Sequence, residues 1–176
     1  MVDVSAQGTE VSITFGDKKM VGGKVVWGNL KHLPVKKTDF ADQENPISPG
    51  RVPASQLEVD LNGNGIVSRQ VTPIRLTLSL IPNSWTDLVM RAHVYVAREG
   101  TTMKSPVRTA FGGAGSEYHA LVERMTISYP NGTVAVFLDG TVSVGTMSPG
   151  VSQDGRLVGS SYEFTFAKAD MPQEKP

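Results

Sequence analysis

Short segments in which apolar and polar residues alternate are the feature that most constrains the fold of this chain. Residues 11–15, 74–80 and 162–166 each place a valine, isoleucine, leucine or aromatic residue at every second position, with mostly serine, threonine or a charged residue between. A period of two puts one face of a strand on a core and the other face toward water or a partner. The pattern predicts a mainly β protein built from half-buried strands.

Turn residues separate further segments of the same kind. Strands are expected at residues 24–30, 56–61 and 66–71. Residues 125–138 are typical of a hairpin, because Pro130, Asn131 and Gly132 supply a tight turn in the middle. Asp139 and Gly140 are expected to start another turn before a strand at 141–144.

One segment has helical rather than strand periodicity. Ser84 is a candidate N-cap, and Asp87 follows three residues later as in a capping box. The apolar residues after it recur at helical spacing: Trp85, Leu88, Val89, Ala92 and Val96. These signals predict a helix over about residues 85–93, and the β-branched and aromatic residues at 93–97 leave its end open.

The expected fold is an antiparallel β-sandwich or barrel with one packed helix, in a single domain over 1–170 with a flexible tail at 171–176.

Composition excludes several classes of protein. The 176 residues contain no cysteine, which excludes disulfides, thiolate metal ligands and cysteine nucleophiles. Seventeen Lys and Arg balance 17 Asp and Glu, whereas nucleic-acid binders normally carry a basic excess. No apolar run approaches the roughly 18 residues of a membrane helix, and the first residues do not have the character of a secretion signal. The chain is therefore expected to have no membrane partner.

The segment DLNGNGIVS matches part of a calcium-binding loop. Asp60, Asn62 and Asn64 occupy the first, third and fifth positions of that template. Val71 stands where a bidentate glutamate should complete the ligand shell, and strands rather than helices flank the segment. We interpret it as a hairpin turn of asparagine and glycine, with calcium as the weaker alternative.

Nothing in the sequence predicts an enzyme. The three histidines, His32, His93 and His119, stand alone, and no nucleophile or phosphate-binding motif is present. No catalytic residue and no cofactor is therefore expected. Trp85, at the start of the helix, is predicted to pack in the core. For Trp27 the sequence favours neither the core nor an exposed face on which it would stack on sugars.

Two long segments rich in proline and glycine, 34–53 and 100–118, lack strand or helix periodicity. Loops of this length in a compact domain are usually functional or become ordered by a partner. We expect them to form a subunit interface, and the candidate contact residues in them are Pro46, Pro49, Arg51, Lys104, Arg108 and Phe111.

The alternating strand, the capped helix and the β-rich second half together resemble a known family. The segment SRQVTPIRLTLSLIPNSWTDLVM (68–90) carries most of the likeness. It is similar to the tail-tube and tube-like baseplate proteins of contractile bacteriophages and related injection systems. The likeness covers about half of the chain and lies in the pattern rather than in a signature motif.

The resemblance implies a non-enzymatic structural subunit. In that family a small β-sandwich or barrel carries one packed helix, and six copies close into a ring around a channel through which DNA passes. It also implies other tail or baseplate proteins as partners, assembly in the bacterial cytoplasm and a final place in the virion tail. A tube, tube-capping, initiator or baseplate position stays open. The alternative from a different class is a β-sandwich module that binds carbohydrate or a cell surface.

Overall fold

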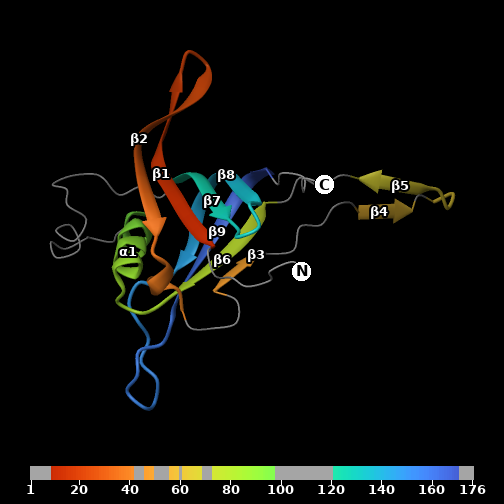
Figure 1. Ribbon diagram of the computed structural model, residues 1–176. Helices are drawn as coiled ribbons and strands as arrows, with labels where there is room; N and C mark the ends of the chain where they lie inside the picture. The colour runs from red at the N-terminus through yellow and green to blue at the C-terminus, as the bar shows by residue number, and fades with distance from the viewer. Residues whose placement is uncertain are drawn as a thin grey trace.

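The computed structural model describes residues 9–41, 46–49, 56–59, 61–68, 73–97 and 121–170. Seven strands form one antiparallel sheet in the order β2-β1-β7-β8-β9-β6-β3 (Figure 1). Their bounds are β1 (Glu10–Val21), β2 (Lys24–Val35), β3 (Ile47–Pro49), β6 (Ile74–Leu80), β7 (Leu121–Ser128), β8 (Val134–Gly145) and β9 (Ser160–Asp170). In the described part of the chain, β2 and β3 do not pair with each other, so the sheet is open rather than closed.

Three further elements complete the described structure. The helix α1 (Trp85–Ala97) packs on β8, and a short 3-10 helix, η1 (Lys37–Asp39), touches its start. The strands β4 (Gln56–Val59) and β5 (Gly65–Ser68) form a separate two-stranded sheet. The predicted mainly β fold with one packed helix is confirmed.

The period-two pattern of the sequence corresponds to two unlike faces of the main sheet. Buried positions alternate with half-exposed ones along β1, β6 and β9. Buried side chains from both halves of the sheet, including Phe15 of β1 and Leu78 of β6, belong to one core cluster together with Val89 and Met90 of α1. A single sheet can share one core in this way only if it curves around it, with α1 covering part of the inner face.

The helix is longer than the sequence predicts. It continues through the residues of strand-like composition to Ala97, because His93 and Val94 are buried against the sheet. The ring of His93 stacks on Phe15 at 3.5 Å between centroids. Packing of this kind overrides the modest helix propensity of β-branched and aromatic residues.

Two other expectations about loops and turns are wrong in part. Segment 34–53 contains regular structure: β2 runs to Val35, η1 follows, and β3 pairs with β6. Leu33 and Val35 continue the buried face of β2, and Pro34 is tolerated because β2 is an edge strand. No turn occurs at 139–140. There β8 continues through a local irregularity in which Asp139 has φ +59°, and its pairing with β7 keeps the same register on both sides.

The irregularity brings Gly140 against the neighbouring strand. A Cβ atom at this position would lie 2.6 Å from the carbonyl oxygen of Thr165 and would also clash with the ring of Phe166. Because a backbone atom cannot move aside as a flexible side chain can, glycine is the residue that fits here.

Candidate assembly surfaces

A buried polar network fixes α1 on the sheet. The carboxylate of Asp87 accepts hydrogen bonds from the Tyr162 hydroxyl, the Arg91 guanidinium and, at 2.7 Å, the backbone N–H of Asn83. Arg91 also donates to the side chain of Asn83 at 3.2 Å and to Ser160 at 3.5 Å. A buried ion pair is tolerated when further hydrogen bonds satisfy its members, and here they join the helix to β9.

Burial raises the pKa of the Tyr162 hydroxyl well above its usual value, and the hydrogen bond to Asp87 raises it further. The hydroxyl therefore stays protonated and acts as a donor over the whole physiological range. A raised pKa can mark a functional site, but here the geometry indicates a structural role. The group lies in the core and faces the helix α1 rather than an open cleft.

Ser84 caps the start of α1 as the sequence predicts, whereas Asp87 accepts the backbone N–H of Asn83 in place of the Ser84 N–H of a capping box. Ser84 accepts the backbone N–H of Asp87 at 3.3 Å. Asp39 of η1 accepts both the N–H and the hydroxyl of Thr86, at 3.0 and 2.6 Å. These bonds satisfy donors that a helix N-terminus leaves unpaired, and the negative charge suits the positive end of the helix dipole.

The face of the sheet opposite the core is polar. Ser12 lies between Pro34 and Thr126 in the register, and Thr14 lies between His32 and Arg124. Thr14 and His32 approach to 3.3 Å between Oγ1 and Nδ1. At the end of this face near Glu10, a hollow of about 520 Å³ is lined by residues of β1, β2 and β7 together with Thr9 and Lys37. Four of the lining residues carry a hydroxyl group. Such a surface stays hydrated, and its charges are mixed in sign.

A two-stranded arm projects from one end of the sheet (Figure 1). We define the arm as residues 17–28, the part of β1 and β2 beyond Gly16, where the pairing of β1 with β7 ends. Four apolar side chains near its Gly-Gly turn are largely exposed: Met20 (68%), Val21 (60%), Val25 (50%) and Val26 (47%). Isolated exposed apolar residues are common, whereas a group of them on a projecting element is the kind of surface that makes the arm a candidate for contact with a partner.

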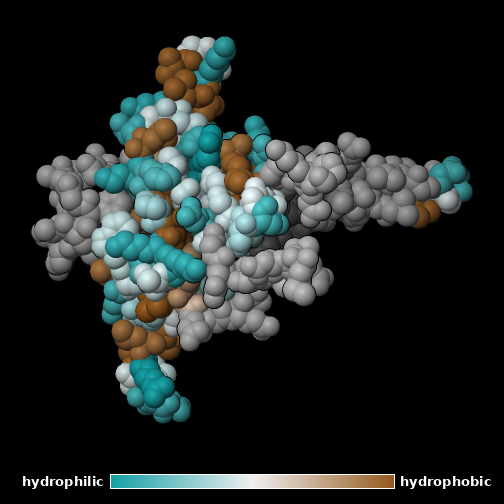
Figure 2. Space-filling model, viewed as in Figure 1, coloured by the Kyte–Doolittle hydropathy of each residue, from teal (hydrophilic) through white to brown (hydrophobic). Residues whose placement is uncertain are grey.

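A second exposed apolar group lies in the last residues of β8 and in the segment that connects β8 to β9. We call residues 144–158 the foot. Val151 and Leu157 form an isolated bridge in it, and Val144, Val151, Leu157 and Val158 are each between 47 and 68% exposed. Figure 2 shows apolar side chains gathered at two protrusions at opposite ends of the molecule, which correspond to the arm and the foot.

The predicted site residues fall into three groups. Pro46 and Pro49 border and end β3, at the edge of the sheet. Asn62 and Asn64 lie in the turn between β4 and β5, as the turn interpretation of this segment predicts, and Gly63 has the positive φ of +81° that the turn requires. Asp60, Arg51, Lys104, Arg108 and Phe111 lie outside the described residues, as do the loop 100–118 and the tail 171–176.

The two tryptophans and two of the three histidines lie among the described residues, whereas His119 lies outside them. Trp85 is partly buried against the core, as predicted, with the Lys36 ammonium 4.9 Å from its ring centroid. Trp27 is half-buried in the arm, and the Lys18 ammonium lies 5.4 Å from its ring. His32 is exposed and His93 is buried, so the structure does not bring these two histidines together.

The arm and the foot were missed as sites by reasoning from the sequence. The arm lies in part in a segment expected to form a strand, and residues 148–158 of the foot have the proline and glycine content of a loop. Only the fold shows that the core does not cover their apolar residues. The available signal was the segment MVGGKVV, in which apolar residues flank a two-glycine turn. The apolar residues there are adjacent in the sequence, so they lie on both faces of the two strands, although the sheet supplies no neighbours beyond Gly16 among the described residues.

The open, curved sheet with one packed helix and a hydrated outer face defines a mainly β structural class. Comparison with known families then identifies the chain: it belongs to the family described as tail fiber protein gp32, which matches residues 23–170. The resemblance to phage tail proteins that the sequence indicates is thereby confirmed. A search of curated proteins found no match.

One solved structure also aligns over almost the whole chain. It is the sheath/tube terminator of an extracellular contractile injection system (PVC) in its extended state, solved by cryo-electron microscopy. The identity is 12% and the TM-score 0.46, with 98% of this chain and 99% of that chain covered. Among the described residues, no helix has the length and apolar character needed to cross a membrane.

Proposed function

We propose that this chain is a non-enzymatic structural subunit of a phage tail, in the tube or baseplate, and that its copies assemble into a ring around a channel for DNA. The observation that carries the proposal is the open sheet with one apolar face, one serine- and threonine-rich face, and two edge strands that have no outer partner strand among the described residues. In this proposal the polar face lines the channel. The partners are further copies of the chain and other tail proteins.

Ring formation would solve a problem that the open sheet poses. An exposed edge strand offers unpaired N–H and C=O groups to any passing chain. In the described residues, one edge is the twelve-residue β2, which pairs only with β1, and the other edge is the three-residue β3. Pairing of unlike edges between copies is a heterologous contact, which gives a ring when the rotation closes. Six copies is the number that the resemblance to tail-tube proteins implies.

The mixed charge of the polar face is suited to DNA that passes through the channel without binding to its wall. Arg75, Arg124 and Lys168 are balanced by Glu10, Glu163 and Asp170 on the described strands. A strongly basic face would hold DNA through its phosphates, and the affinity would depend steeply on salt. We infer assembly in the cytoplasm of the bacterial host and a final location in the virion.

The segments 34–53 and 100–118 are proposed to complete the subunit interface through Pro46, Pro49, Arg51, Lys104, Arg108 and Phe111. Deleting residues 105–115 is expected to block assembly while leaving a folded monomer. Circular dichroism verifies the fold of the variant. A variant that still forms rings would exclude this loop from the interface.

Light scattering after size-exclusion chromatography, with negative-stain microscopy of the same fractions, tests the proposal. The expected result is rings or stacked rings. A protein that stays monomeric at every concentration, and also with other tail proteins added, would overturn it.

The second candidate is a carbohydrate or cell-surface binding module. The description of the family as a tail fiber protein favours it, and Trp27 of the arm is the aromatic residue placed to stack on a sugar ring. A glycan array followed by calorimetry with Trp27→Ala as the matched variant distinguishes the two functions. Specific binding that is lost in the variant, by a protein that does not assemble, would make this candidate the correct one.

A further inference from the structure

The arm carries exposed apolar side chains on both of its faces. Beyond Gly16, β1 pairs only with β2 among the described residues, so the arm is a ribbon of two strands. Met20 lies opposite Val25 in the register and shares one face with it, whereas Val21 and Val26 lie toward the other face. A flat protein surface would cover one face of such a ribbon and leave the other in water. A fluid apolar medium that surrounds the ribbon covers both faces at once.

The turn at the tip of the arm is built without polar side chains. Gly22 and Gly23 have φ of +59° and +76°, and in the described structure no atom lies within 4 Å of where their Cβ atoms would be. Tight hairpin turns commonly place asparagine or aspartate before the glycine. The β4–β5 and β7–β8 turns follow that preference, with Asn62 and Asn64 in the first and Asn131 in the second. The turn of the arm therefore brings no side-chain hydrogen-bonding group into an apolar phase.

The charge of the arm favours an anionic surface. Residues 18–28 contain three lysines, all exposed, and no acidic residue. The charge of Lys18 is offset by its ion pair with Asp139 of β8, whereas no acidic residue in 18–28 offsets Lys19 or Lys24. Because Lys24 stands next to the turn, its ammonium must return to the headgroups along its own alkyl stem, which keeps any insertion shallow.

Trp27 lies at the base of the arm. A Cβ atom at Gly16 would lie 3.4 Å from its ring and 2.8 Å from the Leu30 side chain, so both side chains lie over β1 where glycine leaves room. The Lys18 ammonium is 5.4 Å from the ring centroid. At roughly 3.3 Å per residue, Trp27 is about 13 Å along the strand from Gly23. Tryptophan, with an apolar ring and a polar N–H, is enriched at this level of a membrane, between the acyl chains and water.

We propose that the arm docks on a lipid leaflet with anionic headgroups, with its tip inserted to the headgroup boundary and Trp27 at the interface. Insertion takes the four apolar side chains of both faces out of water together. The arm projects beyond the rest of the main sheet, so its tip can reach a flat surface first (Figure 1). A hairpin that enters one leaflet needs no spanning segment, so the fold provides a membrane contact that the sequence does not predict. Docking does not require the proposed ring, because the whole arm belongs to one chain.

The fluorescence of Trp27 reports insertion directly. The chain has two tryptophans, so Trp85→Phe leaves Trp27 as the only one. The probe is a vesicle of phosphatidylcholine and phosphatidylglycerol in equal parts, with phosphatidylcholine alone for comparison. We expect sedimentation with the anionic vesicles, a blue shift of the Trp27 emission and its quenching by brominated lipid. Sedimentation of the parent gives the same test without the substitution. The absence of vesicle binding in both the monomeric and the assembled fractions would overturn the proposal.

One substitution on each face tests insertion against a one-sided contact. Met20→Asp and Val21→Asp should each lower the vesicle partition coefficient on the order of 10-fold or more, because either one brings a carboxylate into the lipid. Val59→Asp adds the same charge on β4, at a residue that is 65% exposed, and should bind as the parent does. All three should keep the circular dichroism of the parent. A loss for one face only would indicate a protein partner, and it would overturn the proposal, as would unchanged binding by both arm variants.

The lysines test the headgroup contact. Lys24→Gln should weaken binding to the anionic vesicles about fivefold, and Lys168→Gln, an exposed position on β9, should not. Equal effects of the two substitutions would contradict docking through the arm. Light scattering of the same samples separates this inference from the proposed ring. Rings without vesicle binding would overturn the inference alone, and vesicle binding by a protein that never assembles would overturn the ring alone.

Discussion

The buried network under α1 allows a quantitative prediction. Asp87→Ala removes the acceptor shared by the Tyr162 hydroxyl, the Arg91 guanidinium and the Asn83 N–H. Arg91 is only 7% exposed, and its Nε already has no hydrogen bond among the described residues. Breaking a buried ion pair from one side costs about 3–5 kcal/mol, because the remaining charge stays buried without a partner. A domain of this size loses about 2–4 °C per kcal/mol, so the melting temperature should fall by roughly 6–20 °C.

The double variant Asp87→Ala/Arg91→Met removes both charges. Comparison with Asp87→Ala therefore separates the free energy lost with the ion pair from the free-energy cost of leaving Arg91 buried without a partner. Replacing both members of an ion pair with apolar groups is often close to neutral, so the remaining cost is that of the other hydrogen bonds, at about 1–3 kcal/mol. These are the bonds that Tyr162 and the Asn83 N–H donate to Asp87 and the bonds that Arg91 donates to the Asn83 side chain and Ser160. The double variant should therefore be more stable than Asp87→Ala. Urea unfolding followed by circular dichroism measures each free energy, at one concentration and with the same oligomeric state, because assembly adds apparent stability. If the loss of unfolding free energy in the double variant equalled the sum of the losses in Asp87→Ala and Arg91→Met, the idea that these residues act as one buried pair would be refuted.

Three further predictions follow from single positions. Gly140→Ala should cost about 1–3 kcal/mol in the same assay, because its Cβ meets the backbone of Thr165, whereas Gly150→Ala, whose Cβ has only ordinary contacts, should stay near the parent. For Tyr162, the raised pKa means that its stabilising effect is fully present below the unfolded pKa of about 10 and is lost as the pH rises above it. Tyr162→Phe should therefore be less stable than the parent at pH 7 and lose less stability above pH 10; parallel curves would contradict this. Asp60→Ala and the parent should each melt at the same temperature in calcium as in chelator, and a rise with calcium that only the parent shows would favour the calcium interpretation over the turn.

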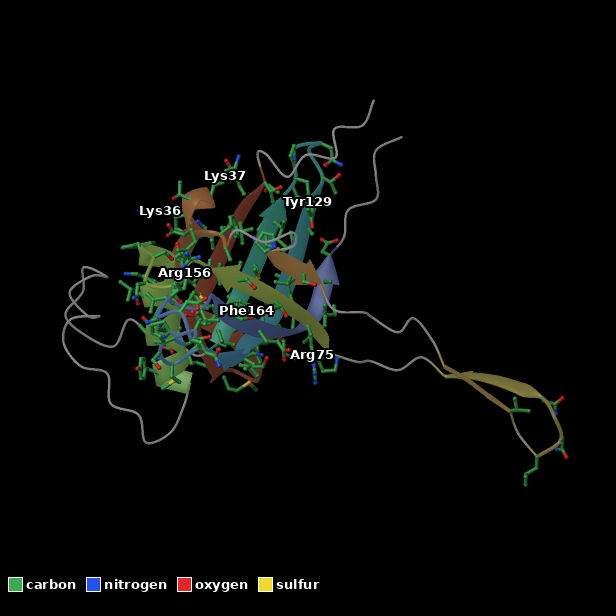
Figure 3. All side chains as sticks on the ribbon, turned by 90° about the horizontal axis from the view of Figure 1, so that it is seen from below. Lys36, Lys37, Arg75, Tyr129, Arg156 and Phe164 are labelled. Carbon is green, nitrogen blue, oxygen red and sulfur yellow. The ribbon has the colours of Figure 1, made fainter. Side chains whose placement is uncertain are left out.

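The β4–β5 ribbon lies apart from the seven-stranded sheet that carries Phe164, as the view from below shows (Figure 3). The sequence predicts both strands and their turn correctly, because Asn and Gly suit the turn. It does not reveal that they form a sheet of their own, since strand periodicity is the same whether the partner strands lie in the main sheet or elsewhere.

Local chemistry by itself determined the strands, the helix start and the central hairpin. Alternation fixed which side chains of residues 11–15, 74–80 and 162–166 face the core, because one face of each strand must leave water. Ser84 fixed the start of α1 by accepting an N–H that the helix leaves unpaired, and Gly132 fixed the hairpin turn with its φ of +82°.

Tertiary structure decided the rest. The length of α1 depends on the stacking of His93 on the ring of Phe15. The end of β2 depends on the burial of Leu33 and Val35 in the core. The order of the strands and the exposure of the arm and the foot depend on which residues distant in sequence meet. A valine in a strand segment has the same local sequence whether or not another strand covers it, so only the assembled sheet shows that the valines of the arm remain in water.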